Sequence, residues 1–139
     1  MKNITISLLT IIFSVSIGYS QKADDITGKY HLPNKLDIEI FKYKTTYAGR
    51  IIALNGFENG QTKDIKNPDG KKRNDPLTGK VIITGLKFNP ETKTWENGKM
   101  YGAEKGMFFN LRIKKLKKDK ITVEASKYFF KKTIDWERI

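Results

Sequence analysis

Four oxygen-bearing side chains lie close together in this 139-residue sequence and are the first candidates for chemistry: Asp64, Asn67, Asp69 and Asp75. Carboxylate and amide oxygens on a glycine-containing loop can ligate calcium, which takes about six to eight oxygens. The further acidic positions and the closing glutamate of a calcium-binding loop are absent, and Asn-Pro-Asp-Gly is first of all a turn composition. We therefore predict no metal site, and expect Asp64 and Asn67 to order a loop or to contact a ligand.

A basic cluster follows directly in the same loop, at Lys71-Lys72-Arg73. These side chains can pair with the neighbouring Asp69 and Asp75, and exposed pairs of this kind contribute about 0–1 kcal/mol each. The alternative is a gate that draws an anionic ligand towards a binding site. We include Arg73 among the predicted ligand contacts.

Aromatic residues with a polar tip form a second group of candidates: Trp95, Tyr101, Tyr128 and Trp136. Each combines a large apolar ring with a hydrogen-bonding group, which suits the wall of an apolar pocket that orients a ligand. Aromatic residues in strands also serve as plain core, and the sequence fits both uses. We predict that Trp95 and Tyr101 offer apolar walls to a ligand.

The composition excludes several kinds of site. There is no cysteine, which rules out disulfides, iron–sulfur clusters, thiolate zinc and thiol nucleophiles, and a single histidine rules out histidine-rich metal centres. No nucleophile lies beside a general base, and acids such as Glu91 and Glu104 stand in charged or turn-rich contexts. We predict a protein that has no cofactor and is not an enzyme, with an uncharacterised hydrolase as the alternative.

The chain is strongly basic, with a formal net charge of +12, and 23 of its 27 basic residues are lysine. Lysine supplies point charges rather than the planar fork with which arginine binds bases and phosphates. Five lysines crowd one predicted hairpin, at positions 114, 115, 117, 118 and 120, without interleaved aromatic residues for base stacking. The pattern indicates a charged soluble surface or attraction to an anionic envelope component, such as lipopolysaccharide, acidic polysaccharide or lipid, and not nucleic acid.

Residues 1–20 have the three-part layout of a secretory signal peptide. A basic start is followed by an apolar run from Ile4 to Ile17 and by small residues at Gly18 and Ser20. As a helix, this run of 14 residues is about 21 Å long, which is short for a hydrocarbon layer about 30 Å thick. We predict cleavage between Ser20 and Gln21 and export to the periplasm or beyond, with no transmembrane segment after cleavage.

The remainder of the chain shows the two-residue alternation of short strands and no convincing helix. The clearest alternation runs through residues 109–114 and, after a turn at 117–120, through residues 121–126. An interior Asn97-Gly98 pair indicates a bulge in one strand. We expect about eight strands, at residues 26–30, 36–40, 47–54, 81–88, 95–101, 109–114, 121–126 and 133–139.

Evenly spaced strands without a long crossover favour an all-β fold, and an up-and-down antiparallel β-barrel rather than a sandwich. Closure also removes the exposed edges of an open sheet. The one long connection, residues 57–80, belongs to a class of loops that are usually functional or mobile. We predict one monomeric barrel domain over residues 21–139, with this loop as a lid over the barrel mouth.

The order and spacing of several motifs resemble an uncharacterised bacterial family, domain of unknown function 2147. The motifs are Asp64-Ile65-Lys66-Asn67-Pro68-Asp69, Arg73, Pro76-Leu77, Gly79, the 82–86 strand, Trp95, Gly98, Tyr101, Gly106 and Trp136-Glu137-Arg138. The resemblance covers residues 26–139 and implies a small exported protein, but it brings no established activity. Some members carry a cysteine pair in the long loop, where this chain has Asp64 and Asn67.

A second resemblance, to the lipocalin and related calycin barrels, concerns one end of the barrel. In those barrels an arginine on the last strand lies across an aromatic ring of a Gly-x-Trp motif on the first strand. This chain has Tyr30 in place of the tryptophan and Arg138 on the last predicted strand. The resemblance implies a cation–π contact between them, worth roughly 0.5–2 kcal/mol, with Trp136 as a third closing residue.

These observations predict an exported barrel that binds a small or amphipathic ligand at its mouth. The alternative is a basic interaction module with a filled barrel that holds an anionic envelope component. A cavity of about 300 Å³ or more favours the first hypothesis, because that is the lower limit of ordinary ligand pockets. A solid interior favours the second.

Overall fold

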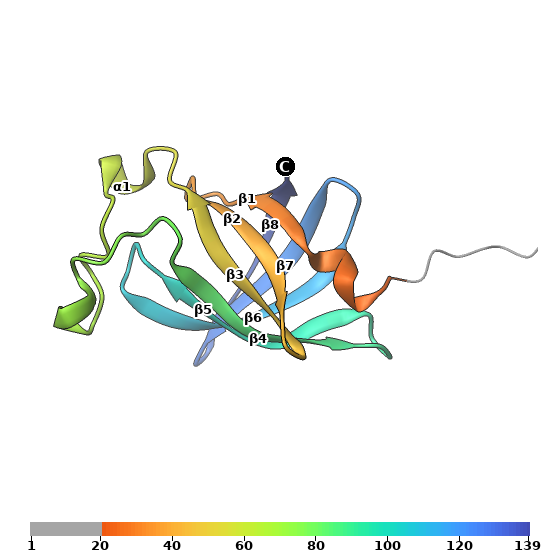
Figure 1. Cartoon of the computed structure of the whole chain (residues 1–139). Coiled ribbons are helices and arrows are strands. Elements are labelled where there is room, and N and C mark those ends of the chain that lie inside the picture. The colour runs from red at the N-terminus through yellow and green to blue at the C-terminus, as the bar shows by residue number, and fades with distance from the viewer. Residues whose placement is uncertain (1–20) are drawn as a thin grey trace, which may run out of the picture.

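The computed structural model describes residues 21–139, and the predicted signal peptide of residues 1–20 lies outside the described residues. Consecutive strands pair with one another in antiparallel fashion, and the last strand pairs back onto the first, so that the sheet closes into a barrel (Figure 1). The strands are β1 (Gly28–His31), β2 (Asp37–Tyr43), β3 (Thr46–Ala53), β4 (Val81–Asn89), β5 (Thr94–Gly102), β6 (Met107–Leu116), β7 (Lys120–Lys127) and β8 (Phe130–Arg138). The predicted all-β, eight-stranded, up-and-down barrel is confirmed.

The two-residue alternation of the strands sorts apolar side chains to the barrel interior. On β6, for example, Leu111 and Ile113 are buried, whereas Asn110 between the strand's apolar positions is exposed. The predicted strand boundaries differ from the observed ones by three residues at most. The predicted bulge is also present, since the pairing of β5 with β6 shifts register between Trp95 and Gly98.

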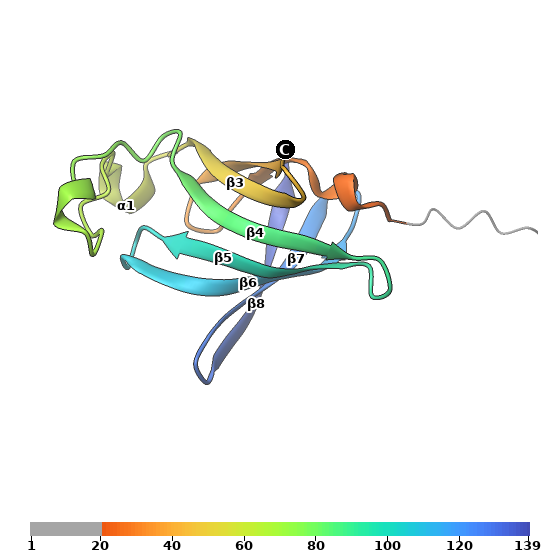
Figure 2. The same cartoon turned by 60° about the horizontal axis from the view of Figure 1, so that its bottom comes forward.

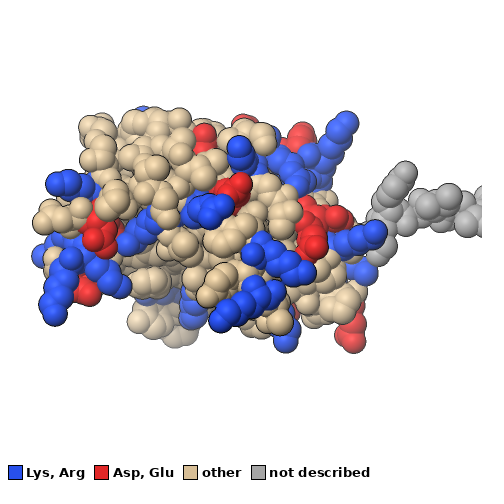
Figure 3. All heavy atoms as spheres, viewed as in Figure 1, with Lys and Arg blue, Asp and Glu red and all other residues tan. Residues whose placement is uncertain are grey.

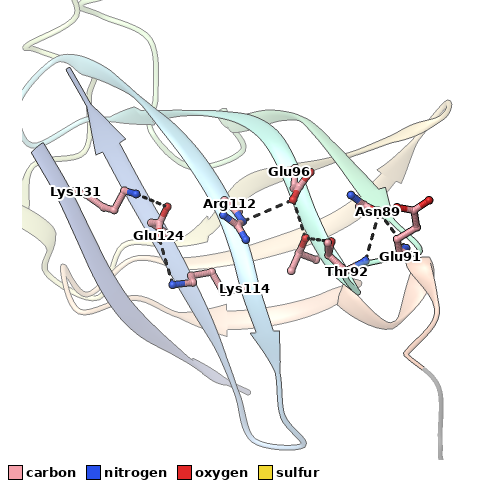
Figure 4. Close-up of polar contacts among 9 residues, drawn as sticks. Asn89, Glu91, Thr92, Glu96, Arg112, Lys114, Glu124 and Lys131 are labelled. Carbon is pink, nitrogen blue, oxygen red and sulfur yellow. Dashed lines mark hydrogen bonds and ion pairs between the residues drawn. The ribbon is translucent and has the colours of Figure 1, made fainter. Parts of the chain in front are cut away.

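The outward faces of the same strands carry paired charges (Figure 4). The Glu124 carboxylate on β7 lies 3.3 Å from Lys114 Nζ and 3.7 Å from Lys131 Nζ, one partner on each neighbouring strand. Arg112 Nε lies 3.8 Å from Glu96 Oε1. The basic partners in these pairs remain exposed to solvent in part, and pairs that solvent reaches contribute about 0–1 kcal/mol each. On the face shown in Figure 3, basic side chains are likewise dispersed among acidic ones.

The connections between strands divide between two ends of the barrel. Residues 32–36, 54–80, 103–106 and 128–129 connect strands at what we term the open end. The opposite, closed end carries the N-terminal residues 21–27 and the turns at 44–45, 90–93 and 117–119. The long loop and the N-terminal segment accordingly lie at opposite sides of Figure 1.

Helical structure within residues 21–139 is limited to three single turns: η1 (Ala23–Ile26), α1 (Phe57–Gly60) and η2 (Gly70–Lys72). The first of them replaces the beginning of the strand that we predicted at residues 26–30, because Ile26 belongs to η1. No helix in the described part of the chain is long and apolar enough to cross a membrane.

Candidate functional site

A cavity of about 300 Å³ opens at the open end of the barrel. Its walls are mainly apolar and come from β5 to β8 and from the connection between β1 and β2. The apolar lining residues are Leu32, Pro33, Met100, Phe109, Val123, Ala125, Phe130, Ile134 and Trp136. The barrel is therefore filled by side chains towards its closed end and hollow at its open end, which we term the mouth. The sequence could not distinguish this arrangement from a solid interior.

Three charged residues also line the cavity: Glu104 and Lys105 in the connection between β5 and β6, and Lys132 on β8. Side chains along a strand alternate between its two faces, so Lys132 shares a face with Ile134 and Trp136. Because these residues also line the cavity, Lys132 belongs to the inward face of β8. Glu104 Oε2 is buried and has no hydrogen-bond partner within residues 21–139. An unpaired buried oxygen of this kind is one that a ligand donor can satisfy.

A second polar group lies near the same end and consists of Asp64, Asn67, Lys80 and Tyr101, which we term the loop clasp. Asp64 is completely buried. Its Oδ1 accepts a hydrogen bond of 2.7 Å from Tyr101 Oη, and its Oδ2 accepts one of 2.7 Å from Asn67 Nδ2. Lys80 Nζ lies 3.2 Å from the same Oδ2. Both carboxylate oxygens are therefore occupied, and the clasp ties the long loop to β5.

The environment of the loop clasp favours an ionised carboxylate beside a neutral phenol. Burial opposes ionisation of Asp64, but the hydrogen bonds from Asn67, Tyr101 and Lys80, together with the charge of Lys80, hold its pKa below the usual value. Burial and the neighbouring Asp64 carboxylate raise the pKa of Tyr101 well above its usual value. Asp64 is thus a fixed hydrogen-bond acceptor, and its arrangement serves to hold the loop.

The loop clasp lies on the outer side of the barrel wall and not in the cavity. Met100 and Gly102 line the cavity, so Tyr101 between them points to the opposite face of β5. Its ring packs against Phe108, with 5.1 Å between ring centroids. None of the cavity-lining residues comes from residues 57–80. The loop that we predicted as a lid therefore covers the outer wall at the rim.

The residues of the long loop that we predicted as ligand contacts lie outside the mouth cavity. Asp64, Asn67 and Tyr101 come together in the clasp, and Arg73 is exposed but donates from Nε to the Asn67 backbone carbonyl over 2.9 Å. Lys71 and Lys72 are exposed in η2, whose N-terminus is capped by the Asp69 carboxylate. None of these residues lines the mouth cavity, so the predicted contacts of Asp64, Asn67, Arg73 and Tyr101 with a ligand find no support in its geometry.

Trp95 lies at the closed end, away from the cavity. It is fully buried, packs against Phe88 with 4.9 Å between ring centroids, and donates from Nε1 to the Ala23 carbonyl over 3.0 Å. Its ring is thus part of the core that η1 covers, and it is not one of the walls of the mouth cavity. Trp136, which we expected to help close the barrel, does line that cavity.

Arg138 and Tyr30 meet at the closed end. The guanidinium lies over the Tyr30 ring, 5.6 Å from its centroid, and donates from Nη2 to the carbonyls of Asp25 and Thr27 over 3.0 and 2.8 Å. Tyr30 Oη donates to the Ile26 carbonyl over 2.7 Å. Gly28, with φ of +150°, leaves room for this arrangement, because a Cβ there would lie 3.1 Å from Arg138 Nη2. Arg138 thereby fastens η1 across the end of the barrel.

Sequence reasoning missed the residues that carry charge into the cavity. Glu104 and Lys105 follow Tyr101 in a tight turn, and Lys132 interrupts an apolar alternation on β8. The interruption was a usable signal, since a lysine at an inward position of a barrel strand has to be solvated by a cavity or to meet a ligand. Within residues 21–139 no three acidic or histidine side chains are grouped so as to hold a metal ion.

Comparison with known proteins places the chain in a family and supports the fold. The family model described as an uncharacterized protein conserved in bacteria (DUF2147) matches residues 27–138. The chain belongs to this family. The motifs that first indicated DUF2147 include Asp64, Asn67 and Tyr101, all members of the clasp. Gly106, another of these motif residues, lies against the same loop: its φ is +62°, and a Cβ there would lie 2.0 Å from the Lys66 carbonyl oxygen.

Among solved structures, this DUF2147 chain is similar to protein HP1028 from the human pathogen Helicobacter pylori, which is described as belonging to the lipocalin family. The TM-score is 0.69 at 21% sequence identity, over 81% of this chain and 82% of that chain. At this identity the similarity shows the fold alone, and the fold is a lipocalin-like barrel. No curated protein matches the chain.

Proposed function

We propose that this DUF2147 protein is a binding protein that holds a small amphipathic ligand in the mouth cavity. The observation that carries the proposal is the apolar cavity of about 300 Å³ at the open end of a closed barrel. That volume is at the lower limit for ligand pockets, which span roughly 300–1,000 Å³. The apolar body of the ligand would lie against Val123, Ile134 and Trp136.

The charged residues at the rim suit a polar head group. Lys105 and Lys132 outnumber Glu104 among the lining residues, so an anionic head is favoured by simple charge balance. The unpaired Oε2 of Glu104 can accept a hydrogen bond from a hydroxyl or amide of the same head group. The long loop contacts this rim, since Lys66 Nζ donates to the Glu104 carbonyl over 2.8 Å.

The alternative, a basic interaction module with a filled barrel, has less support. The interior is hollow at its mouth, and the lysines of the 114–120 segment lie towards the closed end, away from the cavity. We further propose that the protein acts outside the cytoplasm, as a monomer, after cleavage between Ser20 and Gln21. N-terminal sequencing of the protein from its host's envelope tests this part, and a protein that retains residues 1–20 contradicts it.

Binding is tested with two fluorescent probes of similar apolar body, the anionic anilinonaphthalene sulfonate and the neutral N-phenylnaphthylamine. Substitution Ala125→Phe fills the cavity from β7 and is expected to lower the affinity for both probes by about tenfold or more. Substitution Lys132→Gln is expected to weaken only the anionic probe, by about two- to fivefold, because it removes a charge and keeps the apolar walls.

The matched control for the first substitution is Thr133→Phe, which introduces the same side chain on the outward face of β8. It is expected to leave both affinities unchanged. Thermal unfolding of each variant establishes that it is folded at the titration temperature. Equal affinities of the wild type and a folded Ala125→Phe variant would show that the probes bind elsewhere and would contradict the proposal.

A further inference from the structure

The β7–β8 hairpin ends in three consecutive aromatic residues that lie in solvent. Tyr128 is 91% exposed, Phe129 is fully exposed and Phe130 is 61% exposed. Met107 and Phe108, at the start of the neighbouring β6, are 38% and 56% exposed. Single exposed apolar residues are ordinary on protein surfaces, but several large ones on two adjacent segments at the same end of the barrel indicate a contact surface. We term these five residues the aromatic tip.

The turn of the β7–β8 hairpin places an aromatic residue in an unfavourable backbone conformation. The hairpin turn holds Tyr128 at φ of +53°, a left-handed conformation that favours glycine and is rare for an aromatic residue. Beyond the pair Asn110 and Ser126, the hairpin has no ladder partner in β6 and projects from the barrel wall (Figure 2). An aromatic residue, Tyr128, therefore occupies a turn position whose backbone conformation favours glycine.

Lysines surround the aromatic tip. Lys127, Lys131 and Lys132 flank the three aromatic residues along the hairpin, and Lys105 lies across the cavity rim. Lys127 Nζ donates to the Phe108 carbonyl over 2.9 Å and lies 5.6 Å from the centroid of the Tyr128 ring. Lys131 pairs with Glu124 at 3.7 Å but remains 66% exposed. The tip thus combines exposed rings with a surplus of positive charge.

We propose that the aromatic tip docks on the surface of an anionic phospholipid bilayer. Aromatic rings are favoured at the level of the lipid head groups, where an apolar body and a polar environment meet. Lysines next to them gain from the negative surface potential of anionic lipids. Charge complementarity therefore selects this partner over a neutral bilayer, and the projecting hairpin lets the rings reach the head groups without distortion of the barrel.

Docking at this place would bring the mouth cavity to the lipid surface. Phe130 and Lys132 belong both to the hairpin and to the lining of the cavity. A ligand with an apolar body could then pass between the bilayer and the cavity without crossing water. Membrane docking goes beyond the proposed function and does not require it, because the exposed rings and lysines act on the bilayer whether or not the cavity is occupied.

The proposal is tested by flotation of the protein with vesicles made of equal parts phosphatidylcholine and phosphatidylglycerol, compared with vesicles of phosphatidylcholine alone. We expect the protein to bind the anionic vesicles and not the neutral ones. The double substitution Tyr128→Asn with Phe129→Ser is expected to lower the affinity by about tenfold or more, because two apolar rings are lost. Asparagine tolerates the left-handed turn conformation, so the hairpin is retained.

Two matched controls come from the closed end of the barrel. Tyr43 is 55% exposed in the β2–β3 hairpin, and Tyr43→Ser is expected to leave vesicle binding unchanged. The double substitution Lys105→Gln with Lys131→Gln, at the open end, is expected to weaken binding by about 25-fold, since each lysine near an anionic surface contributes a factor of about five. The same charge change at Lys117 and Lys118 is expected to have a smaller effect.

Three outcomes would overturn the proposal. The first is a wild-type protein that does not float with anionic vesicles. The second is an equal loss of binding in the Tyr43 variant and in the tip variant. The third is a dimer in light scattering that the tip substitutions dissociate, which would make a second copy of the chain the partner. Titration of the tip variant with N-phenylnaphthylamine keeps the two proposals apart, because cavity binding is expected to be unchanged.

Discussion

At the closed end of the barrel Trp95 and Tyr30 are fully buried beneath η1, whereas at the open end Phe129 and Phe130 stand in solvent. The polar tips at the closed end have partners within the chain, as in the hydrogen bonds from Trp95 and Tyr30 to the backbone carbonyls of η1. At the open end Glu104 Oε2 has none within residues 21–139. The buried hydrogen-bonding groups of the closed end are thus paired within the chain, whereas the open end presents aromatic rings and the Glu104 oxygen to another molecule.

The contrast separates residues that hold the fold from residues that are free to bind. Apolar surface that is buried stabilises the folded state by about 25 cal/mol per Å², and surface left exposed contributes nothing until a partner covers it. The closed end should therefore control the free energy of unfolding, and the mouth and the aromatic tip should control binding. Substitutions at the two ends test this division of roles.

The largest difference is expected between Trp95→Ala and Phe130→Ala. Trp95 is fully buried, so its truncation leaves a cavity and a free Ala23 carbonyl, and should lower the free energy of unfolding by about 3–5 kcal/mol. Phe130 is 61% exposed, and its truncation should change that free energy by about 0.5 kcal/mol or less. Urea unfolding measures both free energies, and similar losses in the two variants would contradict the division between a stabilising closed end and a binding open end.

The loop clasp is expected to give the next largest effect. Asp64→Ala leaves the Tyr101 hydroxyl and Lys80 without their carboxylate and should lower the free energy of unfolding by about 3 kcal/mol. The exposed Asp75 of the same loop supplies the control, since Asp75→Ala should cost about 0.5 kcal/mol or less. An equal effect of the two substitutions, again in urea, would mean that the clasp does not anchor the loop.

The fold was predictable because alternation and turn composition are local. Residues 109–114 and 121–126 alternate strictly, and β6 and β7 contain them and extend one or two residues beyond them at each end. The four residues of η1 are too few to show a helical period, so the element that covers the closed end was missed. Its position depends on Arg138, which is distant in sequence, and no local pattern reports such a contact.

The candidate site was less predictable, because alternation cannot tell which side of a barrel wall a loop will cover. Tyr101 and Asp64 are 37 residues apart and meet on the outer face, whereas we predicted each of them as a ligand contact at the mouth. Tyr128 was a candidate for a pocket wall, but its side chain is exposed. The β7–β8 hairpin continues beyond Ser126, the last residue of β7 that pairs with β6. An aromatic run bracketed by lysines at a turn was the available signal for the aromatic tip.

A smaller effect is expected from Arg138→Gln at the closed end. The substitution removes the guanidinium from the Tyr30 ring and its two bonds to the carbonyls of Asp25 and Thr27, and should lower the free energy of unfolding by about 1–2 kcal/mol. Arg112→Gln removes an arginine from the outer wall, where its partner Glu96 lies 3.8 Å away, and should cost less than about 1 kcal/mol. A larger loss at Arg112 would contradict the assignment of Arg138 as the fastening of η1.

The smallest effect concerns the pH dependence of the loop clasp. Because the pKa of Asp64 is lower in the folded protein than in the unfolded chain, the unfolded chain binds the proton first as the pH falls. The stability that the ionised Asp64 contributes is therefore fully present above about pH 4 and is lost as the pH falls through the folded pKa. The difference in unfolding free energy between the wild type and Asp64→Asn should be constant near neutral pH and should narrow below about pH 4. The corresponding difference for Asp75→Asn serves as the control, and a difference for Asp64→Asn that widens in acid would show that burial, and not the bonds from Asn67, Tyr101 and Lys80, governs this carboxylate.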